Sequence, residues 1–459
     1  MPIMPKPPRA PGLSFDANRV VCTVMAALGL TTLLPAPAFA DDAAATINAG
    51  DTAWMLVSTA LVLMMTIPGL ALFYGGLVRK GTVLTTMAQS FAVTCLVAVL
   101  WVVVGYSLSF GNGNSYIGDL SRLLVQNVAL EQPFVLGAGT EAPVVTTIPE
   151  TVYMMFQMTF AIITPALISG AFAERMKFSA VLWFMAAWSL LVYAPVAHWV
   201  WHPNGFLFKM GVLDYAGGTV VHINAGIAGL VTALIIGKRV GFPKEVATPH
   251  NLVFSLVGAS LLWVGWFGFN AGSALTAGGR AGMAMAATMV ASGAAGIVWM
   301  FMGWFVYKKP SIVGLISGAV AGLVAVTPAS GFVDITGALI IGLITGVVCF
   351  FACTSLKAKL GYDDSLDCVG VHGVGGLVGA VLTGVLATKA IGGDAASGLI
   401  DGNANQVLVQ LYGIGATVLW CGVMTFIIVK VIQMTHGLRV HEEVERKGLD
   451  HHMHGETLE

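Results

Sequence analysis

Charged residues are scarce in this chain of 459 residues. Lys, Arg, Asp and Glu together make up only 10% of it, whereas soluble domains carry about 25%. Hydrophobic residues make up 57% of the chain, and its mean hydropathy is +0.84. This shortage of charge excludes an ordinary soluble globular protein and indicates a polytopic membrane protein.

The chain also lacks the residue patterns of enzymes and metalloproteins. Its six cysteines lie in or beside apolar segments and none forms a C-x-x-C pair, so neither a disulfide framework nor a zinc site is predicted. The sequence contains no nucleophile–base motif, metal cluster or phosphate-binding loop. We therefore expect no enzymatic activity, no cofactor, no metal and no nucleic-acid partner. His451, His452 and His454 could bind a metal adventitiously, but a solvated tail is the simpler interpretation.

The N-terminal segment has the pattern of a signal peptide. Lys6, Arg9 and Arg19 precede the apolar run VVCTVMAALGLTTLL, which leads into PAFA. A basic region, a short apolar core and a small-x-small site predict cleavage after Ala40. A retained membrane span is the alternative, but the apolar run is shorter than the ~20 residues that a span needs. The predicted domains are a signal peptide (1–40), a membrane domain (41–430) and a C-terminal tail (431–459).

Eleven stretches beyond Asp41 contain at least twenty residues each and no acidic or basic side chain. They are 52–78, 81–118, 151–173, 178–208, 215–237, 246–279, 281–307, 310–333, 335–356, 368–388 and 402–429. Each can cross the ~30 Å hydrocarbon core as a helix that rises about 1.5 Å per residue. Because an open sheet cannot satisfy its backbone polar groups in lipid, we expect an all-α polytopic membrane protein with eleven transmembrane helices.

The basic residues between these stretches predict their orientation. If the first span runs from outside to inside, fifteen of the 22 Lys and Arg residues lie inside and four lie outside, and three belong to the signal peptide. The four outside are Arg122, Lys209, Arg280 and Lys389. This asymmetry follows the positive-inside rule and places the mature N-terminus outside and the C-terminus inside.

Two histidines recur in a similar setting in the fifth and tenth stretches. Asp214 precedes His222 by eight residues, and Asp364 precedes His372 by eight. Glycine-rich segments follow both histidines: TVVHINAGIAGLV and VGVHGVGGLVGAV. Copies five helices apart run in opposite directions, so the pattern predicts an inverted five-helix repeat plus an eleventh helix. In transporters with such repeats, the substrate path lies at the repeat interface near the middle of the membrane.

Histidines inside a bilayer usually line a pathway or pair with each other, because ionisable groups are costly there. Of ten histidines, only His222 and His372 lie deep in the charge-free stretches, whereas we assign His198 and His202 to an outer loop region. Burial disfavours the charged imidazolium, so we expect a mostly neutral, hydrogen-bonded pair that can accept or relay a proton. The alternative is a pair of satisfied core histidines.

Several long contiguous motifs extend over nearly the whole mature chain. They include FQMTFAIITPALISGAFAERMKFSAVL, LDYAGGTVVHINAGIAGLVTALIIGKRVGF, GWFGFNAGSA, SGAVAGLVAVTPASG, GVHGVGG and GLRVHEEVERKGLDHHMHGE. Together they resemble the bacterial Amt branch of the Amt/Mep/Rh ammonium transporters. The resemblance implies an eleven-helix homotrimer in the inner (cytoplasmic) membrane, with one narrow path per subunit for ammonium or ammonia. It also implies that the inside tail and loops bind a trimeric PII signal protein, for which a free tail is the alternative.

The resemblance further implies a set of site residues. They are Phe156, Phe160, Trp201 and Ser273 for ammonium recruitment, Phe160 and Phe269 for a gate, His222 and His372 for the pore and proton relay, Asp214 for support near the outer site, and Thr327 beside the pore. Taken without the resemblance, the phenylalanines would be packing or lipid-facing residues and Trp201 an interfacial belt residue. Asp214 would cap the fifth helix, a structural role that we expect in either case.

Two other functions compete with ammonium transport. An ammonium sensor would use the same outer site, but such proteins tend to carry an appended signalling domain, and only some thirty residues follow the last stretch. A sodium-coupled carrier would require acidic residues in the middle of the membrane, and none of the eleven stretches contains one. The sequence therefore favours a transporter or channel that conducts ammonia past a histidine pair.

Overall fold

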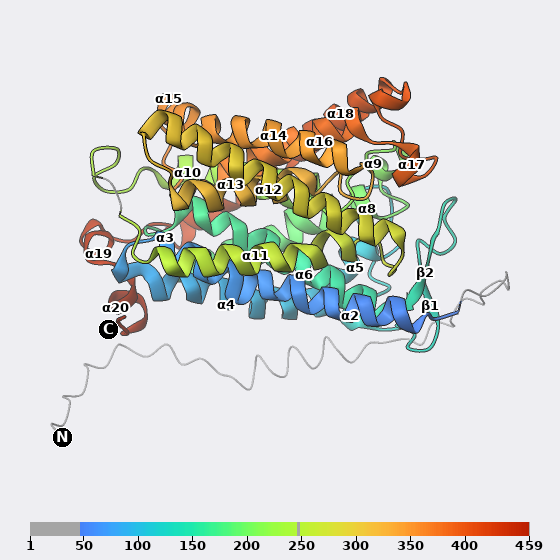
Figure 1. Ribbon diagram of the computed structural model, residues 1–459. Helices are drawn as coiled ribbons and strands as arrows, with labels where there is room; N and C mark the ends of the chain where they lie inside the picture. Colours follow the sequence, from blue (N-terminus) through green and yellow to red (C-terminus); the bar gives the residue numbers. More distant parts are fainter. Residues whose placement is uncertain (1–45, 246–247, 459) are drawn as a thin grey trace, which may run out of the picture. The chain divides into compact units, whose positions relative to one another are not determined.

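The computed structural model describes residues 46–245 and 248–458. These described residues form one compact unit, which is almost entirely helical (Figure 1). The predicted signal peptide and its cleavage site lie outside the described residues.

Ten helical spans of the described chain are long and apolar enough to cross a membrane. They are Ala49–Leu77, Lys80–Phe110, Glu150–Phe172, Phe178–Lys209, Gly218–Ile236, Leu252–Gly272, Gly279–Tyr307, Ile335–Leu360, Val369–Leu386 and Asn405–Thr435. A shorter apolar helix, Ile312–Val326, has 15 residues and lies within the predicted stretch 310–333. Each span overlaps one of the predicted stretches, so the all-helical polytopic fold is as predicted.

Several spans are composed of more than one helical segment. The α-helices in the first half of the chain are α2 (Ala49–Met64), α3 (Ala71–Leu77), α4 (Val83–Leu100), α5 (Tyr106–Phe110), α6 (Glu150–Phe172), α7 (Phe178–Trp188), α8 (Ala194–Trp201), α9 (Phe206–Lys209) and α10 (Asn224–Ile236). Those in the second half are α11 (Leu252–Gly272), α12 (Gly279–Tyr307), α13 (Ile312–Val326), α14 (Ile335–Phe351), α15 (Lys357–Leu360), α16 (Gly375–Leu386), α17 (Lys389–Gly392), α18 (Asn405–Thr435), α19 (Glu442–Lys447) and α20 (Leu449–His454).

Short π-helical and 3-10 segments join or flank these α-helices. The π-helical ones are η1 (Met65–Leu70), η3 (Trp101–Gly105), η5 (Ser189–Tyr193), η6 (Gly218–Ile223), η7 (Ala352–Leu356) and η8 (Val369–Val374). The 3-10 ones are η2 (Lys80–Thr82), η4 (Leu123–Val125) and η9 (Leu399–Asp401). Single-turn π-helical segments within α-helices often lie at functional sites.

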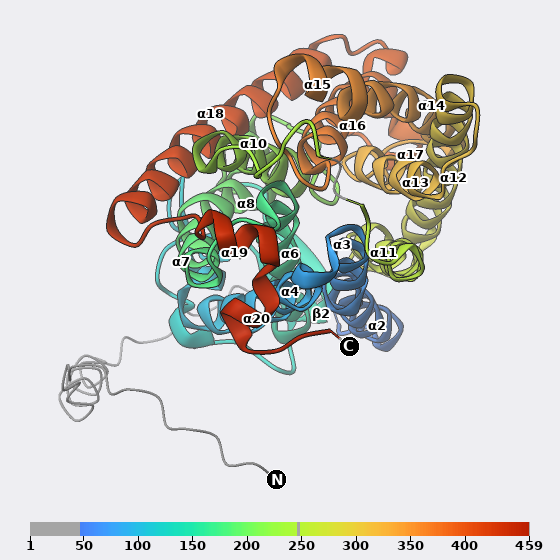
Figure 2. The ribbon, with the colours of Figure 1, turned by 90° about the vertical axis from the view of Figure 1, so that its left-hand side faces the viewer.

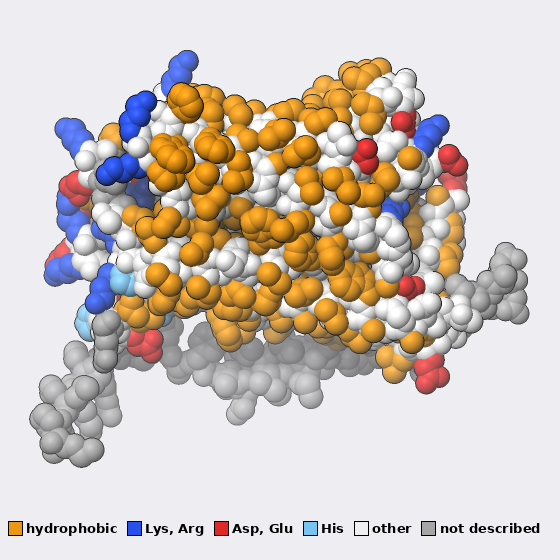
Figure 3. Space-filling view, in the orientation of Figure 1, with side chains coloured by type: hydrophobic (Ala, Val, Ile, Leu, Met, Phe, Trp, Pro, Cys, Tyr) orange, Lys and Arg blue, Asp and Glu red, His pale blue; other side chains and the backbone are white. Residues whose placement is uncertain are grey.

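The helices run between two ends of this unit. One end carries α19 and α20, and we call it the tail end; the other carries β1 (Pro133–Leu136) and β2 (Val144–Pro149), and we call it the hairpin end (Figure 1). The antiparallel pair β1–β2 was not predicted, and it lies outside the helical spans. Lys and Arg side chains gather at the tail end, while hydrophobic side chains cover the surface between the two ends (Figure 3).

The fifth and tenth predicted stretches cross at their glycines. A Cβ added at Gly226 would lie 2.2 Å from the Cα of Gly373, so the two backbones are in direct contact. A Cβ added at Gly376 would lie 3.0 Å from the backbone nitrogen of Ile223. Gly226 and Gly376 each follow a histidine by four residues, and each faces the residue just after the other histidine. Small residues thus allow the close helix–helix approach that membrane proteins use in place of a hydrophobic driving force.

Arg175 joins three segments of the tail end. Its guanidinium group is buried and donates hydrogen bonds to the carbonyl oxygens of Ala171, Gly237 and Asp363, at 3.1, 2.9 and 2.5 Å. Burial lowers the pKa of Arg175 to about 10, so the side chain stays protonated at neutral pH. This one side chain therefore satisfies backbone groups at the ends of α6 and α10 and in the segment before η8.

The C-terminal tail is packed against these segments, and the expectation of a solvated tail is wrong for Glu445 and Asp450. Glu445 is 1% exposed, pairs with Arg439 at 2.8 Å and accepts the backbone N–H of Val240. Asp450 is 2% exposed and accepts the first free N–H groups of α4, from Leu84 and Thr85. Figure 2 views the molecule from the tail end, where α20 lies over α4.

The assignment to an outer loop region is wrong for His198, and both His198 and His202 are covered by other segments. His198 lies within α8 and His202 follows its last residue, and both are 0% exposed. Their rings stack with centroids 4.6 Å apart. His198 contacts the carbonyl oxygens of Ser109 and Asn114, at 3.0 and 2.7 Å. A spacing of four residues places both rings on one helix face, and no local pattern indicated that α5 and the loop after it would cover them.

Candidate functional site

A continuous row of aromatic rings leads from the hairpin end into the protein. Phe156 and Phe160 project from α6 with ring centroids 4.9 Å apart, and the ring of Trp201 lies 5.7 Å from Phe160 at 88°. Phe269 of α11 stacks on Phe160, with centroids 4.1 Å apart and planes inclined by 27°. Both stacked phenylalanines are essentially unexposed. The Phe160–Phe269 pair therefore closes the row on its inner side.

Trp201 and Ser273 lie at the hairpin-end mouth of this row. Both residues are half-buried. The indole N–H of Trp201 donates to the carbonyl oxygen of Asp214 at 3.0 Å, so the ring is fixed in place. The hydroxyl of Ser273 donates to the carbonyl oxygen of Phe269 at 2.9 Å, which leaves the lone pairs of its own oxygen as acceptors.

The two predicted pore histidines meet directly behind the phenylalanine pair. Their rings are nearly parallel, with centroids 5.4 Å apart, and the Nδ1 atoms of His222 and His372 lie 3.3 Å from each other. Such a contact needs one proton between the two nitrogens, so one ring donates and the other accepts. The Nε2 atom of His222 is buried and has no hydrogen-bond partner among the described residues.

Trp266 and Thr327 hold the ring of His222 from the side. The indole of Trp266 stacks on His222 with centroids 5.4 Å apart, and Phe269 lies 6.1 Å away. The Trp266 N–H donates to the Thr327 hydroxyl at 2.8 Å, and this hydroxyl donates to the Leu323 carbonyl at 2.7 Å. Thr327 thus acts through Trp266, a residue that the sequence analysis did not single out.

Asp214 caps the segment that carries His222, as predicted. Its carboxylate accepts the backbone N–H groups of Gly217, Gly218, Thr219 and Val220, together with the hydroxyl of Thr219. Gly217 has a φ of 121°, a conformation that glycine adopts without strain. With five donors on two oxygens, the carboxylate is committed to the start of η6 and leaves little capacity for a cation at the mouth.

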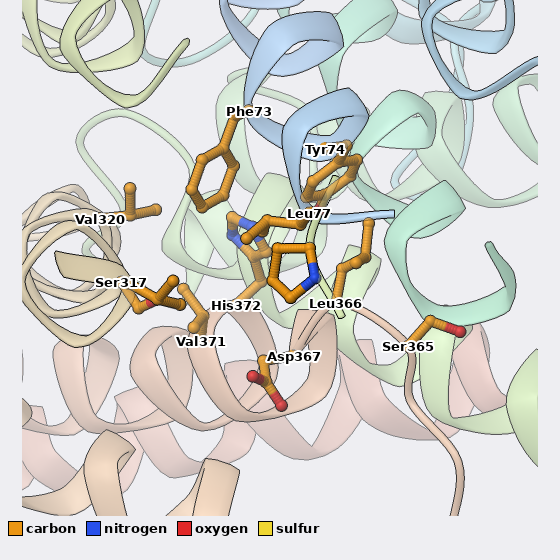
Figure 4. A pocket seen from close by; sticks show the side chains of 12 residues that line it. Phe73, Tyr74, Leu77, Ser317, Val320, Ser365, Leu366, Asp367, Val371 and His372 are labelled. Atoms are coloured by element: carbon orange, nitrogen blue, oxygen red, sulfur yellow. The ribbon is translucent and has the colours of Figure 1, made fainter. Parts of the chain in front are cut away.

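On the tail-end side of the histidines, the structure has a cavity of about 130 Å³. In Figure 4, Phe73 and Tyr74 of α3 lie on one side of it and Asp367 on the other, and His372 is also part of the lining. Ser317 of α13 adds a hydroxyl group to the wall. The sequence analysis missed all of these residues except His372. Asp367 could have been found, because it precedes His372 by five residues at the edge of a charge-free stretch.

Three aspartates in the segment before η8 have different partners. Asp363 pairs with Arg239 at 2.8 Å, and Asp367 pairs with Lys357 at 2.8 Å. Asp364 is fully buried and accepts the backbone N–H groups of Cys368 and Val369, which begin the segment that carries His372. Burial raises the pKa of Asp364 to about 6.

Comparisons with known proteins identify relatives over most of the chain. The model of the Ammonium Transporter Family matches residues 53–459. The ammonium transporter of Bacillus subtilis (strain 168) is 47% identical over 407 residues, which cover 89% of this chain and 98% of that protein. The ammonium transporter of Aquifex aeolicus (strain VF5) is 50% identical over 421 residues, which cover 91% and 95%.

Solved structures share the fold at lower identity. The crystal structure of Saccharomyces cerevisiae Mep2 superposes with a TM-score of 0.79 at 36% identity, covering 87% of this chain and 89% of that one. A structure described as Sensor Amt Protein also gives a TM-score of 0.79, at 26% identity and with coverage of 87% and 97%.

Proposed function

This chain belongs to the ammonium transporter family, and from that premise we propose that it recruits NH4⁺ at the Trp201 mouth, deprotonates it, and conducts NH3 past the histidine pair. As a member of that family it is a multi-pass membrane protein that transports ammonium, and not an enzyme. The observation that carries the proposal is the unbroken contact from Trp201 through Phe160 and Phe269 to His222 and His372.

In this proposal the mature chain spans the inner membrane eleven times, with α13 as the eighth span. The hairpin end is outside and the tail end is cytoplasmic, which agrees with the gathering of Lys and Arg at the tail end (Figure 3). Residues 1–40 are a cleaved signal peptide, 41–430 the membrane domain and 431–459 the cytoplasmic tail. The reciprocal contacts of Gly226 and Gly376 support an inverted repeat centred on the histidines.

Recruitment at the mouth needs only a modest attraction. A cation over the face of Trp201 gains about 0.5–2 kcal/mol, and the Ser273 oxygen accepts one of its N–H groups. Phe156 and Phe160 complete an aromatic surface around the bound ion. Asp214 contributes in two ways. Its carboxylate caps the start of η6, and its backbone carbonyl oxygen accepts the indole N–H of Trp201.

Carrying the intact ion further is far more costly. The idealised cost of moving an ammonium-sized ion into a low-dielectric interior is of order 20 kcal/mol, and several kcal/mol remain after relaxation. A cation–π attraction of about 2 kcal/mol cannot offset this. Neutral NH3 avoids the cost, because it carries no charge and can still hydrogen-bond to imidazole. The closed Phe160–Phe269 pair then acts as a gate that NH3 passes when the rings move.

The histidine pair supplies the polar contact beyond the gate. The Nε2 of His222 has no hydrogen-bond partner among the described residues and is available to a passing NH3 molecule. The shared Nδ1–Nδ1 contact links the two rings for proton exchange. The proton leaves NH4⁺ at the mouth and is relayed separately along His222 and His372, so that the net cargo is ammonium. Potassium is refused because it has no proton to release.

Two partners complete the proposal. The chain assembles as a homotrimer in the bilayer, each subunit with its own path. The cytoplasmic tail and neighbouring loops bind a PII signal protein, which blocks the exits. The ordered tail supports this partner, since Glu445 and Asp450 fix α19 and α20 against the tail-end loops and so present a defined surface.

Current recordings on proteoliposomes test the mechanism. An ammonium jump should give a transient inward positive current with the wild-type chain and none with potassium. Replacing both histidines, as in H222A/H372A, should abolish the ammonium current or admit potassium. Unchanged ammonium current with potassium still excluded would contradict the relay. Ammonium binding without any current or pH change in the wild type would instead favour a sensor, the function in the description of one structural neighbour.

A further inference from the structure

The cavity behind the histidines is lined by a carboxylate that forms an ion pair with a lysine. Asp367 lines the cavity together with His372 (Figure 4). Its Oδ1 atom lies 2.8 Å from the Nζ atom of Lys357. The Asp367 side chain is 38% exposed and that of Lys357 is 18% exposed. Lys357 begins α15 and is not itself part of the cavity lining, so it approaches the carboxylate from outside the cavity.

The other carboxylates of this segment are occupied by different groups. Asp363 pairs with Arg239, and both oxygens of Asp364 accept backbone N–H groups at the start of η8. Within residues 46–245 and 248–458, Lys357 forms an ion pair with Asp367 and with no other carboxylate. Removing Lys357 would therefore expose one particular carboxylate, and that carboxylate faces the path.

We propose that Lys357 promotes the release of NH4⁺ from the cavity. Its ammonium group occupies the Asp367 carboxylate, which would otherwise bind the NH4⁺ ion. The lysine head group is an alkylated ammonium ion, and its seat on Asp367 shows that this carboxylate accepts a cation of that chemistry. The inference rests on the proposed function, in which NH3 that has passed His372 recombines with the relayed proton to form NH4⁺ in the cavity. An unpaired Asp367 would hold that ion, with the rings of Phe73 and Tyr74 on the opposite wall.

The two ends of the proposed path then have opposite requirements for binding the ion. At the hairpin end a weak site is needed to collect the ion, and the carboxylate of Asp214 is already committed to five donors. At the tail end the ion must leave. Lys357 neutralises the carboxylate there, so the cavity keeps a polar wall without a net negative charge.

Charge-removing substitutions test this assignment in proteoliposomes and on purified protein. K357M should lower the maximal ammonium transport rate about tenfold, since a hydrogen bond from a charged group strengthens retention by about that factor or more. It should also lower the half-saturating ammonium concentration, because the product stays bound. K357R should keep most of the wild-type rate. K359M is the matched control: it removes a lysine from the same helix α15, and it should transport like the wild type.

The double substitution separates release from folding. K357M/D367N removes the carboxylate as well as the lysine, so it should recover most of the lost rate. A binding measurement is independent of transport: ammonium should raise the thermal unfolding temperature of K357M but not of K357M/D367N. A wild-type rate in K357M, or a double variant as slow as K357M, would overturn the assignment. A wild-type chain without ammonium current would instead defeat the proposed function, and the unfolding shift of K357M would still be readable.

Discussion

Two segments share the same local features but have different surroundings. One consists of η6 and α10 and carries His222, and the other consists of η8 and α16 and carries His372. Each has an aspartate eight residues before its histidine, a π-helical turn at the histidine and a glycine four residues after it. Around His222 the neighbours are the rings of Trp266 and Phe269, whereas His372 faces a cavity with Asp367 in its wall. The shared features fix the geometry of the pair, and the differing surroundings place each histidine on its own side of the proposed path.

The largest effect is expected from a side chain added at Gly226, where the segments that carry His222 and His372 cross. G226V should abolish ammonium transport and destabilise the protein by about 1–3 kcal/mol, the usual cost of overpacking, because its Cβ would lie 2.2 Å from the Gly373 Cα. G376A should be milder, since its Cβ would lie 3.0 Å from the Ile223 nitrogen. Proteoliposome flux and thermal unfolding measure both effects. The control is G415A on α18, where an added Cβ would meet no atom of another described segment within 4 Å; equal loss in G415A would refute the contact argument.

The two capping aspartates should differ next. D214N should lower the free energy of unfolding by about 2–4 kcal/mol, because a carboxylate that accepts five donors at a helix start is replaced by a single amide oxygen. D364N should lose less at neutral pH, since Asp364 accepts only two backbone donors and its buried negative charge is itself costly. Chemical unfolding in detergent compares them. Equal losses would show that the two caps are equivalent.

The contribution of Asp364 to the free energy of unfolding should depend on pH. Burial raises the pKa of Asp364 to about 6, above the unfolded value of about 3.9, so the folded state binds this proton more tightly. Its contribution of up to about 3 kcal/mol is complete below pH ~4 and is lost as the pH rises towards ~6. Unfolding temperatures between pH 4 and 7 should therefore show a component that disappears in D364N. A D364N profile that parallels the wild type would contradict this assignment.

The smallest expected effect concerns the side support of His222. T327V removes the hydroxyl that accepts the Trp266 N–H, and it should cost about 1–2 kcal/mol because that buried donor loses its partner. Transport should fall by less than in G226V, since the ring contact itself stays. Calorimetric unfolding and flux measure the two effects. T327S keeps the hydroxyl and is the control; a loss in T327S as large as in T327V would argue against the hydrogen bond.

The membrane spans could be predicted because lipid enforces a simple rule: a span carries almost no charge over some twenty residues. The pairing of His222 with His372 could also be predicted, because equal spacing from Asp214 and Asp364 implies equivalent positions in two copies. The aromatic row could not be found from residue pattern alone, since Phe156, Phe160 and Phe269 are indistinguishable in sequence from packing residues. Only the family resemblance singled them out.

What the sequence could not predict depends on contacts between distant segments. Asp450 satisfies N–H groups of α4, which precedes it by more than 360 residues, so the tail looked merely hydrophilic. The cavity at Asp367 needs α3 and α13 to meet the segment before η8, and no local pattern joins them. The covered His198–His202 stack depends likewise on Ser109 in α5 and on Asn114 in the loop that follows it.

The glycine crossing also limits how the molecule can work. Many transporters with inverted repeats alternate between two faces by rocking one repeat against the other. Here the backbones at Gly226 and Gly373 touch beside the two histidines of the proposed path, so rocking would pull the imidazoles apart. In the proposed mechanism, throughput would then depend on brief rotations of the Phe160 and Phe269 rings within a stationary scaffold, as in a filter rather than a pump.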